Sequence, residues 1–276
     1  MSSTPDKYVV FGYPIKHSLS PAIHTLFAEH TEQHIEYDKV QVEGSFYDAL
    51  RRFIDSGGKG ANVTSPFKED AFAIASELSI RAKTAGAVNT LIFENGRVKG
   101  DNTDGIGLVH DLVSQIGSIS GLKILIIGAG GAARGVVNPL FDAQVTKIHL
   151  ANRTPSKAEE LTDIFSQYGD IQGGALNEIP LDEQFDIVIN STSSSVLGEC
   201  PDINPSVFQH AKLVYDMYYH KEDTVFMEFA KSHAPNVQVS DGLGMLIGQA
   251  AESFYLWRGV RPELKPVVAK IKAQLV

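Results

Sequence analysis

Residues 122–134 read LKILIIGAGGAAR, and this stretch decides the fold. A short apolar run leads into a glycine turn, and a helix-like stretch follows. The spacing is G-x-G-x-x-A: Gly128 permits a tight turn, Gly130 lets the backbone approach a pyrophosphate, and Ala133 allows close packing of helix on strand. The helix start also offers unpaired N–H groups and partial positive charge. A glycine turn can join any strand to any helix, but the flanking elements favour a dinucleotide site. Its expected turn residues are Gly128, Ala129, Gly130, Gly131 and Ala132.

The next predicted strand, residues 147–151, indicates which dinucleotide binds. An NAD site usually has Asp or Glu after this strand for the ribose 2′-OH, but the sequence continues Asn152-Arg153-Thr154. Arg153 can bind a 2′-phosphate through its guanidinium group, and Lys157 adds a second cation. Alternatively, both cations are ordinary surface charges. Because the carboxylate is absent and both cations are present, we predict NADP (as NADPH), with Asn152, Arg153, Thr154 and Lys157 at the adenosine end.

Short apolar runs alternate with helix-like stretches along the chain, which is typical of α/β folds with parallel strands. Residues 117–121 are small and polar and resemble a junction. We expect two domains with a cleft between them. Residues 1–104 form the first, residues 105–243 form a Rossmann-type domain, and a C-terminal helix over residues 244–276 returns to the first. The expected strands are residues 8–11, 37–42, 60–64, 88–93, 98–100, 123–127, 147–151, 186–190, 213–216 and 237–239.

Composition excludes several classes of partner. The net charge of −9 argues against nucleic acid or an anionic membrane. The single cysteine allows no internal disulfide and no Cys-rich metal site, so we expect no metal. No apolar stretch approaches the roughly 20 residues of a membrane helix, and the N-terminus lacks a signal-peptide pattern. We expect a cytoplasmic protein, either a homodimer or a monomer, with the homodimer preferred.

Two polar segments in the first half carry candidate catalytic groups. Lys68 follows Asn62-Val63-Thr64-Ser65-Pro66-Phe67 and opens a predicted helix, where a cation is disfavoured. Asp104 precedes another helix, where capping alone would explain it. Carbonyl reduction needs a proton donor, which a lysine oriented by a carboxylate can supply. Taken singly, each residue is more often structural.

Several segments together resemble the shikimate dehydrogenase family over essentially the whole chain. They include FGYPIKHSLSP at residues 11–21, NVTSPFK at 62–68, AGAVNT at 85–90 and GDNTDG at 100–105. The glycine turn, Asn152-Arg153-Thr154, DMYY at 216–219 and DGLGML at 241–246 continue the series. Many NADP-using members carry Arg where Lys157 stands.

This resemblance implies NADPH-dependent, reversible reduction of 3-dehydroshikimate to shikimate, a step of aromatic amino-acid biosynthesis. It implies that the first domain binds substrate, with Lys68 and Asp104 as the catalytic pair. Met217 and Gly242 would border the nicotinamide. The implied substrate-binding residues are Ser18, Ser20, Thr64, Lys68, Asn89, Asp104, Tyr219 and Gln249.

Two alternatives remain open. A broader quinate/shikimate dehydrogenase would share Lys68 and Asp104, but that group often prefers NAD and carries an acid after the second Rossmann strand. A non-catalytic NADP-binding sensor would share the fold without turnover.

Overall fold

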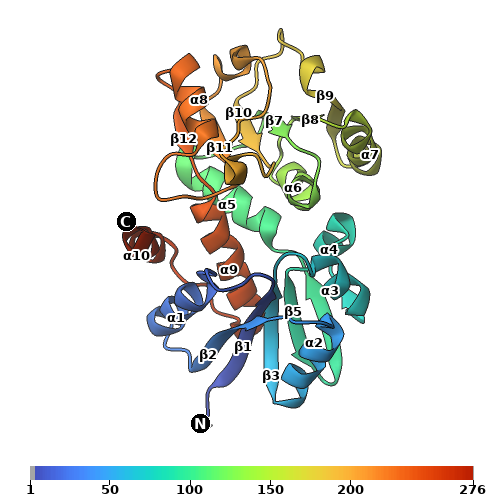
Figure 1. Ribbon diagram of the computed structural model, residues 1–276, viewed down its shortest axis with the longest axis vertical. Helices are drawn as coiled ribbons and strands as arrows, with labels where there is room; N and C mark the ends of the chain where they lie inside the picture. Colours follow the sequence, from blue (N-terminus) through green and yellow to red (C-terminus); the bar gives the residue numbers. More distant parts are fainter. Residues whose placement is uncertain (1–3, 276) are drawn as a thin grey trace. The chain divides into compact units, whose positions relative to one another are not determined.

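The computed structural model describes residues 4–275, which form two compact units. The first comprises residues 4–107 and 247–274, and the second comprises residues 108–246 and 275. Helices α5 (Asp104–Ile116) and α9 (Leu243–Arg258) each contribute residues to both units. Each unit contains its own six-stranded sheet (Figure 1).

The sheet of the first unit has the order β2-β1-β3-β5-β6-β4. Its strands are β1 (Asp6–Gly12), β2 (Ile35–Gln41), β3 (Gly58–Val63), β4 (Glu77–Leu78), β5 (Thr90–Glu94) and β6 (Arg97–Asp101). Strands β2, β1 and β3 are parallel, whereas β5 is antiparallel to both β3 and β6. The end of β3, the start of β5 and the end of β6 therefore meet at one edge, where Asn62 pairs with Thr90 and Thr90 with Asp101.

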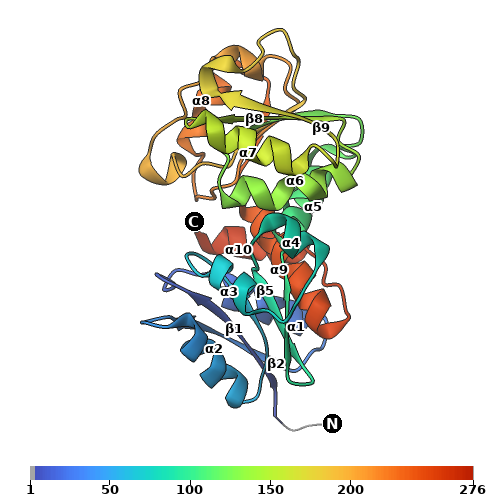
Figure 2. The same ribbon diagram turned by 90° about the vertical axis from the view of Figure 1, so that its right-hand side faces the viewer.

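Helices cover both faces of this sheet (Figures 1 and 2). They are α1 (Ser20–His30), α2 (Phe46–Asp55), α3 (Lys68–Ile74), α4 (Ile80–Ala85), the C-terminal part of α9 and α10 (Lys265–Leu275). Side chains alternate along a strand, so Phe11 and Tyr8 of β1 face opposite sides of the sheet. Phe11 packs against Phe46 of α2. Tyr8 of the same strand stacks on Trp257 of α9, with ring centroids 4.6 Å apart.

The sheet of the second unit is entirely parallel, with the order β12-β11-β10-β7-β8-β9. Its strands are β7 (Lys123–Ile127), β8 (Lys147–Asn152), β9 (Asp170–Ala175), β10 (Ile187–Asn190), β11 (Leu213–Asp216) and β12 (Gln238–Ser240). After β7 the chain adds β8 and β9 on one side of it, and then returns to the other side of β7 as β10. Between β7 and β10 the strand order reverses, and doubly wound sheets bind dinucleotides at this point.

The second sheet is also covered on both faces (Figure 2). Its helices are α6 (Gly131–Asp142), α7 (Pro155–Phe165), α8 (Val225–His233) and the N-terminal part of α9, with most of α5. Short 3₁₀ helices span Leu176–Glu178, Ser195–Leu197 and Pro205–Phe208. Ile124 and Ile126 pack in the cluster that holds α5, α6 and α7, whereas Leu125 and Ile127 pack in the cluster that holds α8. The buried strand ahead of the glycine turn is thus confirmed on both faces.

The predicted α/β class with a Rossmann-type second sheet is confirmed, but some details were wrong. The first sheet is mixed rather than parallel, because Asn95 and Gly96, both at positive φ, close a hairpin between β5 and β6. The expected helix over residues 244–276 is two helices, since Gly259 at φ +69 follows the end of α9. Strands β4 and β9 and helix α4 were not predicted. No helix in residues 4–275 is long and apolar enough to cross a lipid bilayer.

Candidate active site and cofactor site

Lys68 and Asp104 form an ion pair in the first unit. The Lys68 Nζ lies 2.6 Å from Asp104 Oδ2, and the side chains are 32% and 15% exposed. Both are the first residues of helices, α3 and α5 respectively. A helix start favours an anion and disfavours a cation, so the carboxylate compensates for the placement of the ammonium. The pair is partly open to solvent, as a group that exchanges a proton with a ligand must be.

Asn89 joins this pair from the edge of the sheet. Its Nδ2 donates to Asp104 Oδ1 at 2.8 Å, and its Oδ1 accepts from the Thr103 backbone N–H at 2.9 Å. The carbonyl of Lys68 accepts from the Val88 N–H at 2.9 Å, which ties the start of α3 to the segment before Asn89. Lys68, Asn89 and Asp104 therefore converge although they come from three separate segments.

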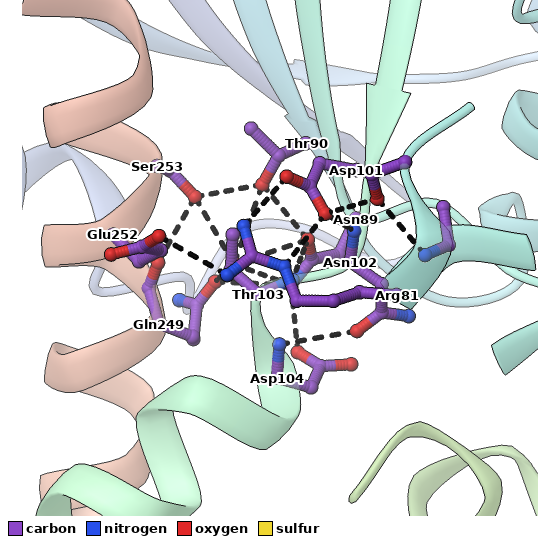
Figure 3. Close-up of polar contacts among 12 residues, drawn as sticks. Arg81, Asn89, Thr90, Asp101, Asn102, Thr103, Asp104, Gln249, Glu252 and Ser253 are labelled. Atoms are coloured by element: carbon purple, nitrogen blue, oxygen red, sulfur yellow. Dashed lines mark hydrogen bonds and ion pairs between the residues drawn. The ribbon is translucent and has the colours of Figure 1, made fainter. Parts of the chain in front are cut away.

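Gln249 reaches the same group from α9 (Figure 3). Its Oε1 lies 3.3 Å from Asn89 Nδ2 and 3.4 Å from Thr103 Oγ1. The structure thus brings together four residues predicted from the sequence: Lys68, Asn89, Asp104 and Gln249.

Ser18, Ser20 and Thr64 follow the carboxyl ends of neighbouring strands in the same unit. The Thr64 N–H donates to the Phe11 carbonyl at 2.9 Å, so it lies beside the end of β1. The Ser20 N–H donates to Ser18 Oγ at 3.3 Å, and Ser20 is 8% exposed. Ser20 is the first residue of α1, and Leu19 holds the cap position.

A buried ion-pair cluster supports the turn that carries Asp104. Asp101 accepts from Arg81 Nε at 3.1 Å and Nη2 at 2.6 Å, and from the Asn102 N–H at 2.7 Å. Arg81 also reaches Glu252 of α9 at 3.2 Å. Burial lowers the Arg81 pKa, but the two carboxylates outweigh this effect and hold the pKa above its usual value. Because both carboxylates are buried, Arg81 keeps this turn from carrying unpaired charge.

In the second unit the glycine turn follows β7. Gly128 has φ +108, and a Cβ there would lie 2.5 Å from Ser191 Oγ, so conformation and packing both require glycine. Gly130 and Gly131 differ, because neither lies at positive φ and a Cβ on either would meet nothing within 4 Å. Gly130 caps α6 in an extended conformation. Open space before a helix start fits the close approach of a pyrophosphate. Ala129 and Ala132 continue this turn into α6.

The turn after β8 presents two cations. Arg153 and Lys157 are exposed, and neither charged group has an ion-pair or hydrogen-bond partner within residues 4–275. Thr154 caps α7 without a side-chain hydrogen bond, and Asn152 Nδ2 donates to the Thr154 carbonyl at 2.9 Å. Ile127 and Ala151 are paired, so this turn adjoins the glycine turn at the same sheet edge. These residues fit a dinucleotide that carries a 2′-phosphate.

Met217 and Gly242 lie in contact at the far side of the sheet switch point. A Cβ at Gly242 would lie 2.1 Å from the Met217 carbonyl oxygen. A Cβ at Gly244 would similarly lie 2.2 Å from the Asp111 carboxyl group. Both glycines therefore serve tight packing within the second unit. Tyr219 also belongs to this unit, and burial raises its pKa.

Sequence reasoning missed several polar residues around the first site. Asn62, Thr90 and Thr103 lie inside segments that were singled out, but no role was predicted for them. Arg81 and Ser253 lie outside those segments, and no local pattern marks them. Within residues 4–275, no group of three or more His, Cys, Asp or Glu side chains is arranged to hold a metal ion.

The glycine turn, the sheet switch point and the unpaired cations define a dinucleotide-binding α/β protein. The Lys68–Asp104 pair adds a proton donor among amides and hydroxyls. Together these features are those of a nicotinamide-dependent oxidoreductase that acts on a polar, oxygen-rich substrate.

Comparison with known proteins gives the family. Residues 10–91 match the shikimate dehydrogenase substrate binding domain, residues 111–200 the shikimate / quinate 5-dehydrogenase model, and residues 242–272 the shikimate 5′-dehydrogenase C-terminal domain. The shikimate dehydrogenase (NADP(+)) of Pseudoalteromonas atlantica is 52% identical over 98% of this chain and 100% of its own. The chain belongs to the shikimate dehydrogenase family, which confirms the resemblance.

Solved structures agree with this assignment. The Thermus thermophilus shikimate 5-dehydrogenase, in complex with NADP(H) and shikimate, superposes with a TM-score of 0.84 at 28% identity, covering 98% of this chain and 100% of that one. The 5-ketofructose reductase of a Gluconobacter strain superposes with a TM-score of 0.88 at 26% identity, with full coverage of both chains. The same fold therefore occurs in proteins named as a shikimate 5-dehydrogenase and as a 5-ketofructose reductase.

Proposed function

We propose that this protein catalyses the NADPH-dependent, reversible reduction of 3-dehydroshikimate to shikimate, a step of aromatic amino-acid biosynthesis. The observation that carries the proposal is the 2.6 Å contact between Lys68 and Asp104. A curated relative at 52% identity with the same named activity supports it. We also propose that residues 1–104 with the C-terminal segment form the substrate-binding and catalytic domain, and that residues 105–243 form the cofactor domain.

The substrate would be held by neutral polar groups and by the catalytic pair. Serine and threonine hydroxyls and side-chain amides suit a polyol acid, because each can bond a hydroxyl or a carboxylate oxygen at a fixed position. The residues we assign to this task are Ser18, Ser20, Thr64, Lys68, Asn89, Asp104, Tyr219 and Gln249.

The cofactor would be held by residues of the second unit. The glycine turn at residues 128–132 would receive the pyrophosphate, and Met217 and Gly242 would border the nicotinamide. Asn152 and Thr154 would lie beside the adenosine ribose. Arg153 and Lys157 would bind the 2′-phosphate, Arg153 through its planar fork and Lys157 as a point charge. When bound, NADPH supplies the hydride.

Lys68 and Asp104 would move the proton. The Lys68 ammonium donates a proton to the carbonyl oxygen as that oxygen gains negative charge. Asp104 holds the ammonium through its Oδ2, and Asn89 holds Asp104 through Oδ1. The three groups are thus in place before the substrate arrives, which lowers the reorganisation that the reaction requires.

Turnover with defined substrates tests this function. Wild-type protein should consume NADPH with 3-dehydroshikimate, measured by loss of ultraviolet absorbance, and should prefer NADPH to NADH. The broader quinate/shikimate activity is the second candidate, since the matched family model names both substrates. Equal or better kcat/KM with quinate and NAD would select it instead. No turnover of either pair would leave the non-catalytic NADP-binding alternative.

We further propose that the protein is cytoplasmic and is a homodimer or a monomer, with the homodimer preferred. The negative net charge supports a freely dissolved protein without an anionic partner. Sedimentation velocity would separate the two oligomeric states, and cell fractionation would test the compartment.

A further inference from the structure

A buried chain of hydrogen bonds in the first unit ends on the Asp104 carboxylate, and Figure 3 shows its part from Ser253 to Asp104. The other members of this chain are at most 7% exposed. They are, in order, Tyr37, Asn62, Ser253, Thr90 and Asn89. Because donors and acceptors must alternate along such a chain, the direction of each bond can be worked out.

The orientation of the Asn89 amide follows from its fixed partners. The Thr103 backbone N–H, which can only donate, lies 2.9 Å from Asn89 Oδ1. The Asp104 carboxylate, which accepts when ionised, lies 2.8 Å from Asn89 Nδ2. Flipping the amide would break both bonds, so the oxygen faces Thr103 and the amino group faces Asp104.

Thr90 supplies the second donor to the Asn89 oxygen. Its Oγ1 lies 2.8 Å from Asn89 Oδ1, and since that oxygen only accepts, Thr90 donates its single hydroxyl proton there. The 2.7 Å contact between Thr90 Oγ1 and Ser253 Oγ then assigns the Ser253 proton to Thr90, the nearer of its two acceptors, since the Gln249 carbonyl oxygen lies 3.0 Å from the same hydroxyl. The Asn89 oxygen is thus held most closely by the Thr90 hydroxyl and the Thr103 backbone N–H, and the Thr103 hydroxyl lies farther away at 3.1 Å.

The remaining bonds point the same way. Asn62 Nδ2 donates to Ser253 Oγ at 3.0 Å and to the Asn89 carbonyl at 3.1 Å. The Asn62 oxygen accepts from the Tyr37 hydroxyl at 2.8 Å. Burial raises the pKa of Tyr37 well above its ordinary value, so the phenol keeps its proton. The bonds that link successive members from Tyr37 to Asp104 therefore run in one direction, and aligned hydrogen bonds in a buried site strengthen one another.

We propose that Thr90 is a positioning residue for the reaction: its hydroxyl fixes the Asn89 amide so that the amino group donates to Asp104. The role rests on the proposed function, because Asn89 and Asp104 are assigned there to the substrate. Thr90 touches neither substrate nor cofactor in this account. It acts through Asn89, and its loss should weaken substrate use without affecting the cofactor site of the second unit.

The substitution Thr90→Val tests this role, since valine keeps the shape, suits strand β5 and removes only the hydroxyl. Losing the nearest donor to the Asn89 oxygen should lower kcat/KM for 3-dehydroshikimate roughly tenfold and leave KM for NADPH unchanged. Thr90→Ser restores the hydroxyl and should stay within about twofold of wild type. Thr162→Val is a matched control in the second unit, where the hydroxyl only bonds the Ala158 carbonyl of its own helix.

A double-mutant cycle separates positioning from a general loss of stability. In an Asn89→Ala background, Thr90→Val should cause no further loss of kcat/KM, because Thr90 acts only through Asn89. Additive losses, or an unchanged kcat/KM in Thr90→Val alone, would overturn the positioning role while wild-type turnover still supported the proposed function. Wild-type protein that consumes no NADPH would instead refute the proposed function.

Discussion

Replacing His24 by phenylalanine should remove a pH-dependent loss of stability from the first unit. His24 is fully buried in α1, and its ring stacks on Tyr37 with centroids 4.2 Å apart and planes at 7°. Phe27, Phe254 and Trp257 also surround it. Burial lowers the pKa of His24 from 6.5 to about 3 because this apolar site disfavours the charged ring.

The size of the effect follows from the two pKa values. Between pH 6.5 and about 3 the unfolded chain binds a proton at this histidine and the folded protein does not. Stability is therefore fully present above pH 6.5 and is lost as the pH falls. At 1.36 kcal/mol for each pKa unit, the loss between about pH 7 and about pH 4.5 is roughly 2.5 kcal/mol. The His24→Phe variant lacks this contribution, and any cost of overpacking is the same at both pH values.

Urea unfolding followed by tryptophan fluorescence measures the difference. Trp257 is the only tryptophan of the chain and packs against His24 in the first unit, so it reports on that unit. Other titrating groups are common to both proteins and cancel in the comparison. The wild-type protein should lose about 2.5 kcal/mol more than His24→Phe on going from about pH 7 to about pH 4.5. Equal losses in the two proteins would refute the neutral, buried state of His24.

Three further predictions concern the cofactor turns and the buried ion pairs. Arg153→Ala should raise KM for NADPH by at least about tenfold and leave KM for NADH unchanged, since it removes a charge-assisted bond to the 2′-phosphate; parallel changes with both cofactors would contradict this. Gly130→Ala should unfold like wild type yet bind NADPH more weakly, because a Cβ at this position meets no protein atom within 4 Å. Gly242→Ala should weaken NADPH binding and also destabilise the protein by roughly 2 kcal/mol or more, because its Cβ would lie 2.1 Å from the Met217 carbonyl oxygen. Equal melting temperatures for the two glycine variants would refute the packing argument. Arg81→Met should cost roughly 3–5 kcal/mol in urea unfolding because it leaves the buried Asp101 carboxylate without an ion-pair partner, whereas Glu252 keeps its pair with Arg261; a loss below about 1 kcal/mol would show that Asp101 is solvated.

The elements with strong local patterns were predictable from the sequence. Residues 124–127 are apolar on both faces and Gly128 follows them, and β7 ends at Ile127. Strand β9 was missed because it carries a single large apolar residue, Ile171, and two glycines. Gly173 is required there by the close approach of α7, whose Ala158 carbonyl would lie 2.9 Å from a Cβ. This requirement arises from tertiary packing, so it leaves no local signal in the sequence.

Several site residues could be predicted because they lie in recognisable segments, but the contacts between their side chains could not. Lys68, Asn89 and Asp104 came from three quoted segments, but only the fold brings their side chains into contact. Ser253 lies 163 positions from Thr90, and it joins the hydrogen-bond chain because α9 packs on the edge where β3, β5 and β6 meet. A serine inside a helix gives no indication of such a role, so this support is visible only in the structure.

The catalytic assignment of the ion pair is tested most directly by Lys68→Ala in the NADPH-consumption assay. Since acid–base groups contribute about 10²–10⁴-fold, kcat with 3-dehydroshikimate should fall by that factor. KM for NADPH should stay unchanged, because the cofactor residues lie in the second unit. A near-normal kcat in this variant would contradict the role of Lys68 as proton donor.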